Sequence, residues 1–431
     1  MNRLQIEKLR LWKNSVNRKP LIIRGARQVG KTWLMKEFGK TDYEKIAYIN
    51  FESSKSLMNL FKNDYDIQRI VNAIQIESGV QINPENTLII FDEIQECECA
   101  LTSLKYFYEN APQFHIIAAG SLLGVSLHQQ TSFPVGKVDF MDLYPLSFRE
   151  FLLALNKTSL YDLLLSQDWS LISSFKSKYI ELLRQYYYIG GMPEAVYSFS
   201  IENDFKKVRG IQISILNAYE QDFSKHAPYE IVPRIRMIWQ SIPSQLAKEN
   251  RKFIYGLIKH GARAKDFELA MLWLLNSGLI YKINRSSKPS IPLLAYMDIS
   301  AFKVFLVDVG LLGAMGNIDV KTIITGNTIF QEFKGSLTEQ FVLQQLVKCQ
   351  KPVIYYWSSE KSIAEVDFLV QYDDNVIPIE VKAEENLHSK SLKSFHQQYN
   401  PSISLRTSMS DYRKDDWLIN IPLYAIENYF Q

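Results

Sequence analysis

The sequence predicts an α/β protein of several domains, the first of which contains a parallel β-sheet. The chain has 431 residues, and because one hydrophobic core rarely grows beyond about 250–300 residues, we expect two to four domains. Short apolar runs alternate with helical stretches over residues 1–150, which is typical of a parallel sheet flanked by helices. A long helix followed by strands returns from about residue 330.

Composition and charge narrow the class of protein. Hydrophobic residues make up 47% and charged residues 22% of the chain, which is typical of a globular protein and disfavours disorder. The formal charge of +3 neither supports nor excludes a nucleic-acid partner. The three cysteines, Cys97, Cys99 and Cys349, lack metal-ligand spacing and indicate a reducing compartment. The charged N-terminus and the lack of a stretch of about 18 apolar residues predict a cytoplasmic protein with no membrane partner.

Changes of pattern divide the chain into four segments. In residues 1–150 the runs LIIR, KIAYINF, TLIIFDE and FHIIAAG are the expected strands. Residues 151–250 are helical in pattern and predict a lid or connector. In residues 251–329 a helix, a turn at Gly261, a second helix over 266–277 and the strand LIYKIN follow in the order of a winged helix. Residues 330–431 predict a separate α/β domain.

The stretch GARQVGKT, residues 25–32, fits the Walker A pattern of a P-loop. It follows the apolar strand PLIIR and precedes a helix that begins at Lys31, a context that argues against a turn without function. Backbone N–H groups of the loop and of the helix N-terminus would bind the phosphates of ATP. Lys31 would neutralise the β- and γ-phosphates, and the Thr32 hydroxyl would reach Mg²⁺. The predicted nucleotide-binding residues are Gly25, Ala26, Arg27, Gln28, Val29, Gly30, Lys31, Thr32 and Trp33.

Two later strands would complete this site. TLIIFDEIQ reads as a buried strand that ends in acids, as a Walker B motif does, although acids at a strand end are also common in solvated loops. Asp92 would hold Mg²⁺ through water, and Glu93 would orient the attacking water. Ser121 ends the strand FHIIAAGS. It is either a γ-phosphate sensor or a cap of the next turn.

Several stretches occur in the order in which a large prokaryotic family of AAA-type ATPases has them, and the chain resembles that family over nearly its whole length. The resemblance implies an ASCE-class P-loop core, a winged-helix middle and a C-terminal domain similar to PD-(D/E)xK nucleases, the restriction-endonuclease-like fold. It implies no settled substrate. Lys137 stands where many members have arginine, so no arginine finger is assigned there. The stretches are LIIRGARQVGKT, LIIFDEIQ, SLKYFYENAP, AAGSLLGVSL, SFPVGKVDFMDLYPLSFREFL, YYIGGMPEAV, FKVFLVDVGLL, EVDFLV and PIEVKA.

The C-terminal acids suggest a second site. Period-2 alternation in VIPIEVKA places Glu380 and Lys382 on one face of a strand. Asp367 points away from the apolar face of the preceding strand, and Glu339 lies on the first long helix. With one or two Mg²⁺ ions held by Glu339, Asp367 and Glu380, and with Lys382 positioning water, the site would hydrolyse phosphodiesters. Alternatively the fold is an inactive binding module.

Two functions remain open. The first is an ATPase whose cycle remodels a nucleic acid or regulates a Mg²⁺-dependent nuclease domain, and the second is a nucleotide-dependent switch or scaffold with a binding module. Basic residues around the winged-helix segment would either contact phosphates or form a solvated face. Oligomerisation is also left open. The basic residues are Arg263, Lys265, Lys282, Arg285 and Lys288.

Overall fold

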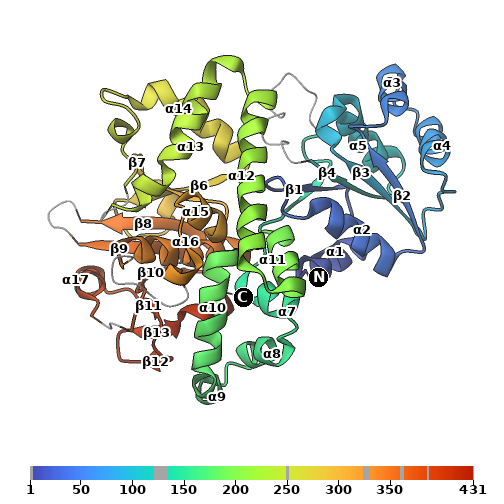
Figure 1. Ribbon diagram of the computed structural model, residues 1–431. Helices are drawn as coiled ribbons and strands as arrows, with labels where there is room; N and C mark the ends of the chain where they lie inside the picture. The colour runs from blue at the N-terminus through green and yellow to red at the C-terminus, as the bar shows by residue number, and fades with distance from the viewer. Residues whose placement is uncertain are drawn as a thin grey trace. The chain divides into compact units, whose positions relative to one another are not determined.

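The chain divides into an N-terminal and a C-terminal unit, each of which contains its own sheet (Figure 1). The N-terminal unit is formed by Asn2–Tyr144 with Asn276–Leu279, and the C-terminal unit by Pro145–Leu275 with Ile280–Gln431. The computed structural model describes residues 3–120, 134–248, 252–323, 331–359, 364–385 and 388–430. The predicted α/β class with a parallel sheet is confirmed. The division into four domains stays a prediction.

The N-terminal sheet has five parallel strands in the order β2-β3-β4-β1-β5. The four apolar runs of the sequence form its first four strands, and β4 lies between β1 and β3. Every residue of β3 is buried, because helices cover both faces of the sheet. The strands are β1 Leu21–Arg24, β2 Lys45–Asn50, β3 Thr87–Asp92, β4 His115–Ala119 and β5 Asp139–Asp142.

Aromatic packing joins the helices to one face of this sheet. Phe51, Phe61 and Phe91 meet edge to face, with ring centroids 5.4–6.0 Å apart. They belong to a core in which side chains of α3, α4 and α5 contact alternate residues of the strands. The N-terminal helices are α1 Gln5–Lys13, α2 Lys31–Asp42, α3 Lys55–Asn63, α4 Ile67–Ser78 and α5 Glu98–Asn110.

The C-terminal unit contains a mixed sheet of eight strands in the order β12-β13-β11-β10-β9-β8-β6-β7. The hairpin β6–β7 comes from the segment predicted as a winged helix, and β6 pairs with β8 through Arg285 and Tyr356. Strands on both sides of the boundary predicted at residue 330 thus share one sheet. The strands are β6 Ile280–Ser286, β7 Met297–Leu306, β8 Val353–Ser358, β9 Glu365–Tyr372, β10 Asn375–Val381, β11 Leu405–Ser408, β12 Arg413–Lys414 and β13 Ile419–Pro422.

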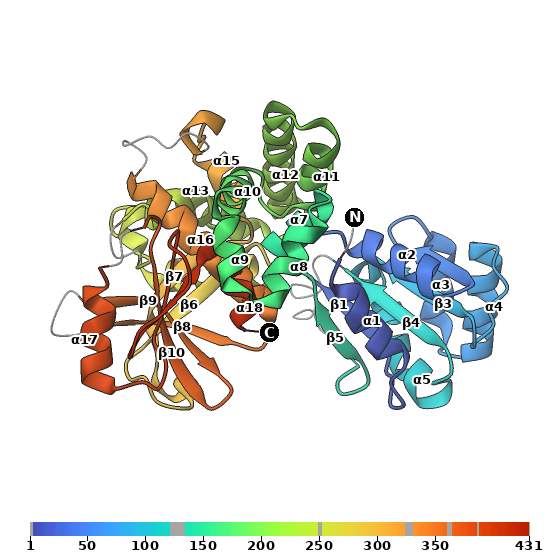
Figure 2. The ribbon, with the colours of Figure 1, turned by 90° about the horizontal axis from the view of Figure 1, so that it is seen from below.

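Helices make up most of the C-terminal unit between residues 148 and 246. Further along the chain, α17 packs Leu392 and Phe395 against strands β8 and β9, and Figure 2 shows it at the sheet. The helices are α7 Phe148–Ala154, α8 Thr158–Ser166, α9 Trp169–Ser174, α10 Lys176–Ile189, α11 Pro193–Glu202, α12 Phe205–His226, α13 Val232–Leu246, α14 Ala264–Asn276, α15 Val309–Met315, α16 Gln331–Cys349, α17 Lys390–Tyr399 and α18 Ile426–Tyr429.

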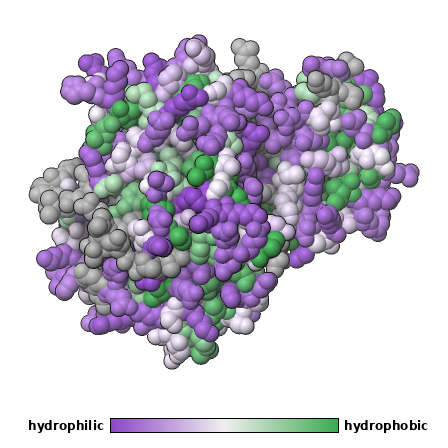
Figure 3. Space-filling view, in the orientation of Figure 1, coloured by the Kyte–Doolittle hydropathy of each residue, from purple (hydrophilic) through white to green (hydrophobic). Residues whose placement is uncertain are grey.

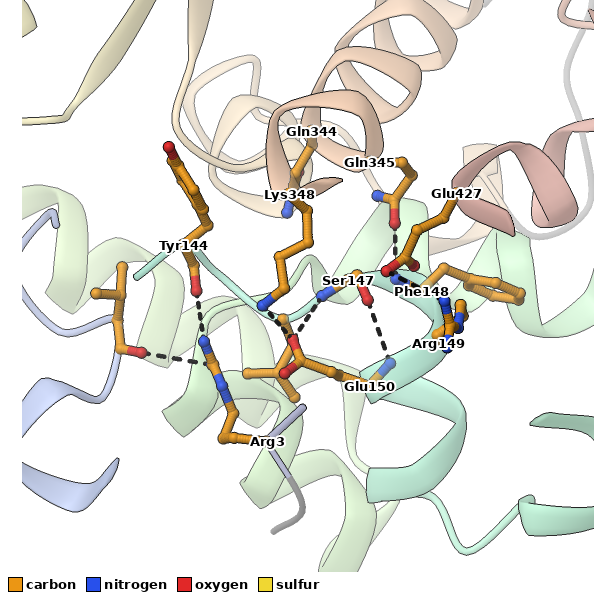
Figure 4. Close-up of polar contacts among 12 residues, drawn as sticks. Arg3, Tyr144, Ser147, Phe148, Arg149, Glu150, Gln344, Gln345, Lys348 and Glu427 are labelled. Atoms are coloured by element: carbon orange, nitrogen blue, oxygen red, sulfur yellow. Dashed lines mark hydrogen bonds and ion pairs between the residues drawn. The ribbon is translucent and has the colours of Figure 1, made fainter. Parts of the chain in front are cut away.

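A buried polar cluster attaches the start of α7 to α16 (Figure 4). Ser147 and Glu150 form a capping box, in which each side chain accepts a hydrogen bond from the other residue's backbone N–H. The Lys348 ammonium donates to the Glu150 carboxylate at 2.7 Å, with both side chains at most 4% exposed. Gln345 accepts from the backbone N–H of Phe148 at 2.8 Å. Because a buried ion pair is costly to break from one side, α7 and α16 are held in a defined arrangement.

Two of the stretches that carry the family resemblance meet at the buried carboxylate of Asp308. It accepts hydrogen bonds from the backbone N–H groups of Gly191 at 2.6 Å and Leu311 at 3.1 Å, and from the Gln344 amide at 3.1 Å. Gly191 lies in YYIGGMPEAV and Asp308 in FKVFLVDVGLL. Both stretches therefore contribute to packing within the C-terminal unit.

The exposed surface mixes hydrophilic and hydrophobic residues. On the face drawn in Figure 3, hydrophobic residues are scattered among hydrophilic ones. In the part of the chain that the structure covers, no helix has the length and apolar character needed to cross a membrane.

Candidate functional site

The loop between β1 and α2 has the backbone geometry of an anion-binding loop. Gly25 has φ +149°, and a Cβ there would lie 2.1 Å from the carbonyl oxygen of Leu143, so a larger residue does not fit. Gly30 is left-handed at φ 92° and ends the loop at the first residue of α2. Gly30 is the N-cap residue of α2 and has no side chain that could cap the helix. The first N–H groups of a helix have no partner within the helix, and a phosphate would bind to them here.

Lys31 lies beneath the loop as a buried cation. Its ammonium donates to the carbonyl oxygens of Gly25 at 2.9 Å and Ala26 at 2.8 Å, and the residue is 7% exposed. Burial lowers the pKa of Lys31 to about 8, although the nearby charges of Glu93 and Asp92 act in the opposite direction. An anionic ligand at the loop would stabilise the charged form of this lysine.

Asp92 ends β3 directly beside the start of α2. The Thr32 hydroxyl donates to Asp92 Oδ2 at 2.7 Å, and the carboxylate is almost fully buried. Asp92 Oδ1 accepts from the backbone N–H of Glu93 at 3.1 Å. The parallel sheet brings these residues together, because the carboxyl ends of β1 and β3 lie at the same edge.

Glu93 follows in an unusual backbone conformation. Its φ of 50° and ψ of 45° place it in the left-handed region, which non-glycine residues seldom adopt. The turn starts a short 3₁₀ helix, η1 Ile94–Glu96. The Gln95 amide donates to Glu93 Oε2 at 2.6 Å. Glu93 is therefore oriented both by its backbone and by a neighbouring amide.

Sequence reasoning missed two residues of this site. Gln95 contacts Glu93, and the Tyr48 hydroxyl donates to Asp92 Oδ2 at 2.9 Å. Gln95 stands two residues after a predicted catalytic acid, so its spacing was available in the sequence. Tyr48 lies on β2, and only the pairing of β2 with β3 brings it to Asp92.

The other residues predicted to bind nucleotide differ in exposure. The side chains of Ala26 and Val29 are buried in the core, so only their backbone groups can face a ligand. Gln28 is exposed, and Trp33 is 37% exposed on α2. The predicted sensor Ser121 lies outside the described residues.

Lys137, to which the sequence analysis assigned no arginine-finger role, forms an ion pair. Its ammonium lies 3.0 Å from the Glu109 carboxylate and 5.5 Å from the Tyr108 ring centroid. These contacts engage the charge of Lys137 within its own unit.

A short segment distant in sequence also belongs to the N-terminal unit. Asn276–Leu279 lies next to the P-loop, where a Cβ on Gly278 would come within 3.2 Å of the backbone nitrogen of Ala26. Gly278 has φ +72°. The loop is therefore enclosed in part by residues that follow α14.

The residues at this edge fit ATP with Mg²⁺. A hydroxyl and a carboxylate, the oxygen ligands that Mg²⁺ favours, lie in contact at Thr32 and Asp92. The open N-terminus of α2 and the Lys31 charge suit a polyphosphate. The structure thus brings together Lys31, Thr32, Asp92 and Glu93, as the sequence analysis expects, while their catalytic roles stay predictions.

Glu339, one of the predicted C-terminal metal ligands, lies on α16 beside a buried lysine. The Lys303 ammonium on β7 is 3.8 Å from Glu339 Oε2 and 2.5 Å from Glu365 Oε1. Lys303 is completely buried, and its ammonium lies 5.0 Å from the ring centroid of Tyr356. Glu339 thus lies within ion-pair distance of an internal cation from the predicted winged-helix segment.

Glu380 and Asp367 lie at neighbouring positions of β10 and β9. The Lys382 ammonium is 2.5 Å from Glu380 Oε1, and Glu380 Oε2 accepts from the backbone N–H of Leu392 at 3.2 Å. Asp367 Oδ2 accepts from the backbone N–H of Val381 at 2.7 Å. Burial raises the pKa of Glu380, Lys382 opposes that shift, and Asp367 adds to it. Glu380 is buried and does not lie on a solvated face of the sheet.

Two different lysines lie beside the predicted C-terminal metal ligands. Glu339 and Glu365 contact Lys303, whereas Glu380 contacts Lys382. Within the described ranges, no group of three or more acidic, histidine or cysteine side chains is arranged to hold a metal ion. Metal binding by Asp367 and Glu380 stays a prediction.

Several of the basic residues near the β6–β7 hairpin have partners within the C-terminal unit. Arg285 pairs with Asp298 at 2.9 Å. The Lys282 ammonium lies 4.3 Å from the Phe302 ring centroid, and burial lowers its pKa. Arg263 and Lys265 are exposed. Nucleic-acid binding by this segment stays a prediction.

Three family models match successive parts of the chain. Residues 17–152 match the family model of an AAA domain, residues 180–322 that of a domain of unknown function (DUF8612), and residues 334–426 that of a second domain of unknown function (DUF4143). The first match includes the P-loop and β3. This supports an AAA-type P-loop ATPase domain with ATP binding and hydrolysis.

Solved structures show weaker likenesses. A Walker-type ATPase of Pyrococcus abyssi is 14% identical, with a TM-score of 0.46, over 72% of this chain and 95% of that chain. The Orc1 protein of Aeropyrum pernix in complex with DNA is 12% identical, with a TM-score of 0.25, over 73% of this chain and 90% of that chain. With TM-scores below 0.5, neither likeness bears on function. No curated protein matches the chain.

Proposed function

We propose that the N-terminal unit binds ATP with Mg²⁺ and hydrolyses it at the edge formed by β1, β3 and α2. The observation that carries this proposal is the 2.7 Å contact between Thr32 and Asp92 beside the buried Lys31. It joins a hydroxyl, a carboxylate and a cation at an open helix N-terminus. The match of residues 17–152 to an AAA domain supports the same function.

Each residue contributes a separate physical effect. The backbone N–H groups of the loop and of α2 bind phosphate oxygens, and Lys31 supplies a positive charge to them. Thr32 and Asp92 would hold Mg²⁺, which when bound neutralises negative charge on the phosphates. Glu93 orients the attacking water, and Gln95 positions the Glu93 carboxylate. Burial of this edge strengthens each electrostatic interaction.

Steady-state ATP hydrolysis tests the proposal. The purified chain is assayed with Mg²⁺ or EDTA, and separately with single-stranded DNA, duplex DNA and RNA. Mg²⁺-dependent release of phosphate is expected. A nucleic-acid motor would turn over about once per second or faster, whereas a switch would hydrolyse ATP more slowly. A chain that neither binds nor hydrolyses ATP would refute the proposal.

For the C-terminal unit we propose a binding module whose engagement depends on the nucleotide state of the N-terminal unit. The support is Lys303, which is completely buried and supplies a positive charge to Glu339 and Glu365. A lysine in this place offsets the charge of Glu339, one of the carboxylates that a nuclease would use for a metal. On this proposal ATP acts as a switch, and its hydrolysis resets the module.

An active nuclease is the second candidate, and one observation favours it. Glu380, Asp367 and Lys382 lie at one end of the β9–β10 pair, where burial and the Asp367 charge disfavour the anionic form of Glu380 and Lys382 favours it. A divalent cation would relieve that repulsion. DNA and RNA are incubated with the chain in Mg²⁺ or Mn²⁺. If the wild-type chain nicks these substrates and if Asp367→Asn and Lys382→Ala each abolish the nicking, the domain is a nuclease. That result would contradict the proposal of a binding module.

A further inference from the structure

Tyr48 belongs to neither Walker motif, yet its hydroxyl donates a hydrogen bond to Asp92. The Asp92 carboxylate accepts hydrogen bonds from Thr32 at 2.7 Å and Tyr48 at 2.9 Å on Oδ2, and from the Glu93 backbone at 3.1 Å on Oδ1. These donors differ in origin, because one lies on α2, one on β2 and one follows β3. Together they hold the carboxylate in one rotamer.

The sheet register explains how Tyr48 reaches a residue of another strand. Asn50 pairs with Asp92 and Tyr48 pairs with Ile90, so Tyr48 and Asp92 lie on the same face of the sheet. Two residues of a strand span about 6–7 Å. A phenol ring is long enough to bridge that offset, whereas the shorter polar side chains are not.

Lys36 stabilises the ring of this tyrosine. Its ammonium lies 3.7 Å from the Tyr48 ring centroid, which is the geometry of a cation–π contact. Lys36 stands one helical turn after Thr32 on α2. The same face of α2 thus supplies one hydrogen bond to Asp92 and one contact to the tyrosine that donates to it.

The Tyr48 hydroxyl is an uncharged hydrogen-bond donor. It can orient Asp92 without taking away the negative charge that attracts a cation.

We propose that Tyr48, supported by Lys36, is a positioning residue that holds Asp92 for the Mg²⁺ of bound nucleotide. This inference rests on the proposed ATP site and adds to it a residue outside both Walker motifs. The hydrogen bond from Tyr48 acts as an outer contact of a metal ligand, and removal of such contacts commonly weakens metal affinity about 10- to 100-fold.

The test compares Tyr48→Phe with the wild-type full chain. Binding of a fluorescent ADP analogue is measured at a series of Mg²⁺ concentrations and in EDTA, and ATP hydrolysis is measured at the same concentrations. Tyr48→Phe keeps the ring and removes one hydroxyl. We expect the half-saturating Mg²⁺ concentration to rise about tenfold, with nucleotide binding in EDTA unchanged. Lys36→Met should shift the Mg²⁺ dependence in the same direction by a smaller factor.

Tyr43→Phe is the matched control, because Tyr43 belongs to the same unit and its hydroxyl pairs with His115. It should leave the Mg²⁺ dependence unchanged. If Tyr48→Phe and wild type respond identically to Mg²⁺, the inference is wrong while the ATP site stands. Equal weakening with and without Mg²⁺ would also overturn it, because Tyr48 would then serve only folding. If the wild-type chain binds no nucleotide at any Mg²⁺ concentration, the proposed function and this inference both fail.

Discussion

The acidic clusters of the two units use the same kinds of side chain in opposite ways. At the end of β3, Thr32 and Tyr48 donate hydrogen bonds to Asp92, and Gln95 donates one to Glu93. In the C-terminal unit, ammonium groups contact the carboxylates of Glu339, Glu365 and Glu380. Uncharged donors orient a carboxylate and leave its charge in place, whereas an ammonium group in contact offsets that charge.

This difference suggests how each cluster responds to an added cation. We expect the β3 cluster, where the Lys31 ammonium donates to loop carbonyl oxygens, to accept a metal that arrives with the proposed nucleotide. The C-terminal carboxylates instead lie within ion-pair distance of ammonium groups. Substitutions that remove one partner at a time therefore test whether the comparison is correct.

The largest expected effect is on turnover. Glu93→Gln should retain ATP binding and lower the rate of hydrolysis by about 10²- to 10⁴-fold, because an amide cannot accept the proton of the attacking water. Single-turnover hydrolysis and equilibrium binding separate the two quantities. Glu96→Gln, an exposed acid of the same 3₁₀ turn, is the control. Normal hydrolysis by Glu93→Gln would mean that the catalytic assignment is wrong.

Removal of the internal cation should have the next largest effect. Lys303→Met should lower the free energy of unfolding by about 3 kcal/mol, because the buried Glu339 and the partly buried Glu365 lose their contact with the ammonium group. Urea denaturation measures the loss. If Mn²⁺ restores the stability of this variant and leaves wild type unaffected, the lysine stands where a metal can bind. Unchanged stability would contradict the role assigned to Lys303.

The P-loop lysine comes third. Lys31→Ala should weaken ATP binding by about 30-fold, since a charged hydrogen bond contributes about 2 kcal/mol. Titration with a fluorescent ATP analogue gives the affinity. Lys40→Ala, which removes an exposed lysine of the same helix, should bind like wild type. Equal affinities for all three proteins would rule out the P-loop as the phosphate site.

The smallest effect concerns pH. In the free protein the pKa of Lys31 is lowered to about 8 by burial, and bound phosphates favour its charged form. Binding above pH 8 therefore takes up a proton, and ATP affinity should fall by up to about tenfold per pH unit between pH 8 and 9. Affinity should become nearly constant below about pH 7 as far as Lys31 is concerned, because Lys31 is then charged in the free protein as well. Lys31→Ala should lose this slope, and a variant that keeps it would show that another group titrates.

Local pattern was sufficient for much of the N-terminal unit. The apolar runs predicted strands β1 to β4, and the spacing from Gly25 to Thr32 predicted the loop and the start of α2. These features depend on neighbours in the chain, because backbone conformation and strand alternation are set over a few residues. The same reasoning placed Asp92 and Glu93 at the end of a buried strand.

Long-range pairing decided the remainder. Tyr48 meets Asp92 through the register of β2 with β3, and Lys303 meets Glu365 because β7 and β9 belong to the same sheet. Asn276–Leu279 reaches the P-loop from far along the chain. The sequence by itself determined which side chains each short segment presents. Only the tertiary structure decided their partners, because strand order and register depend on how whole segments bury their apolar faces against one another.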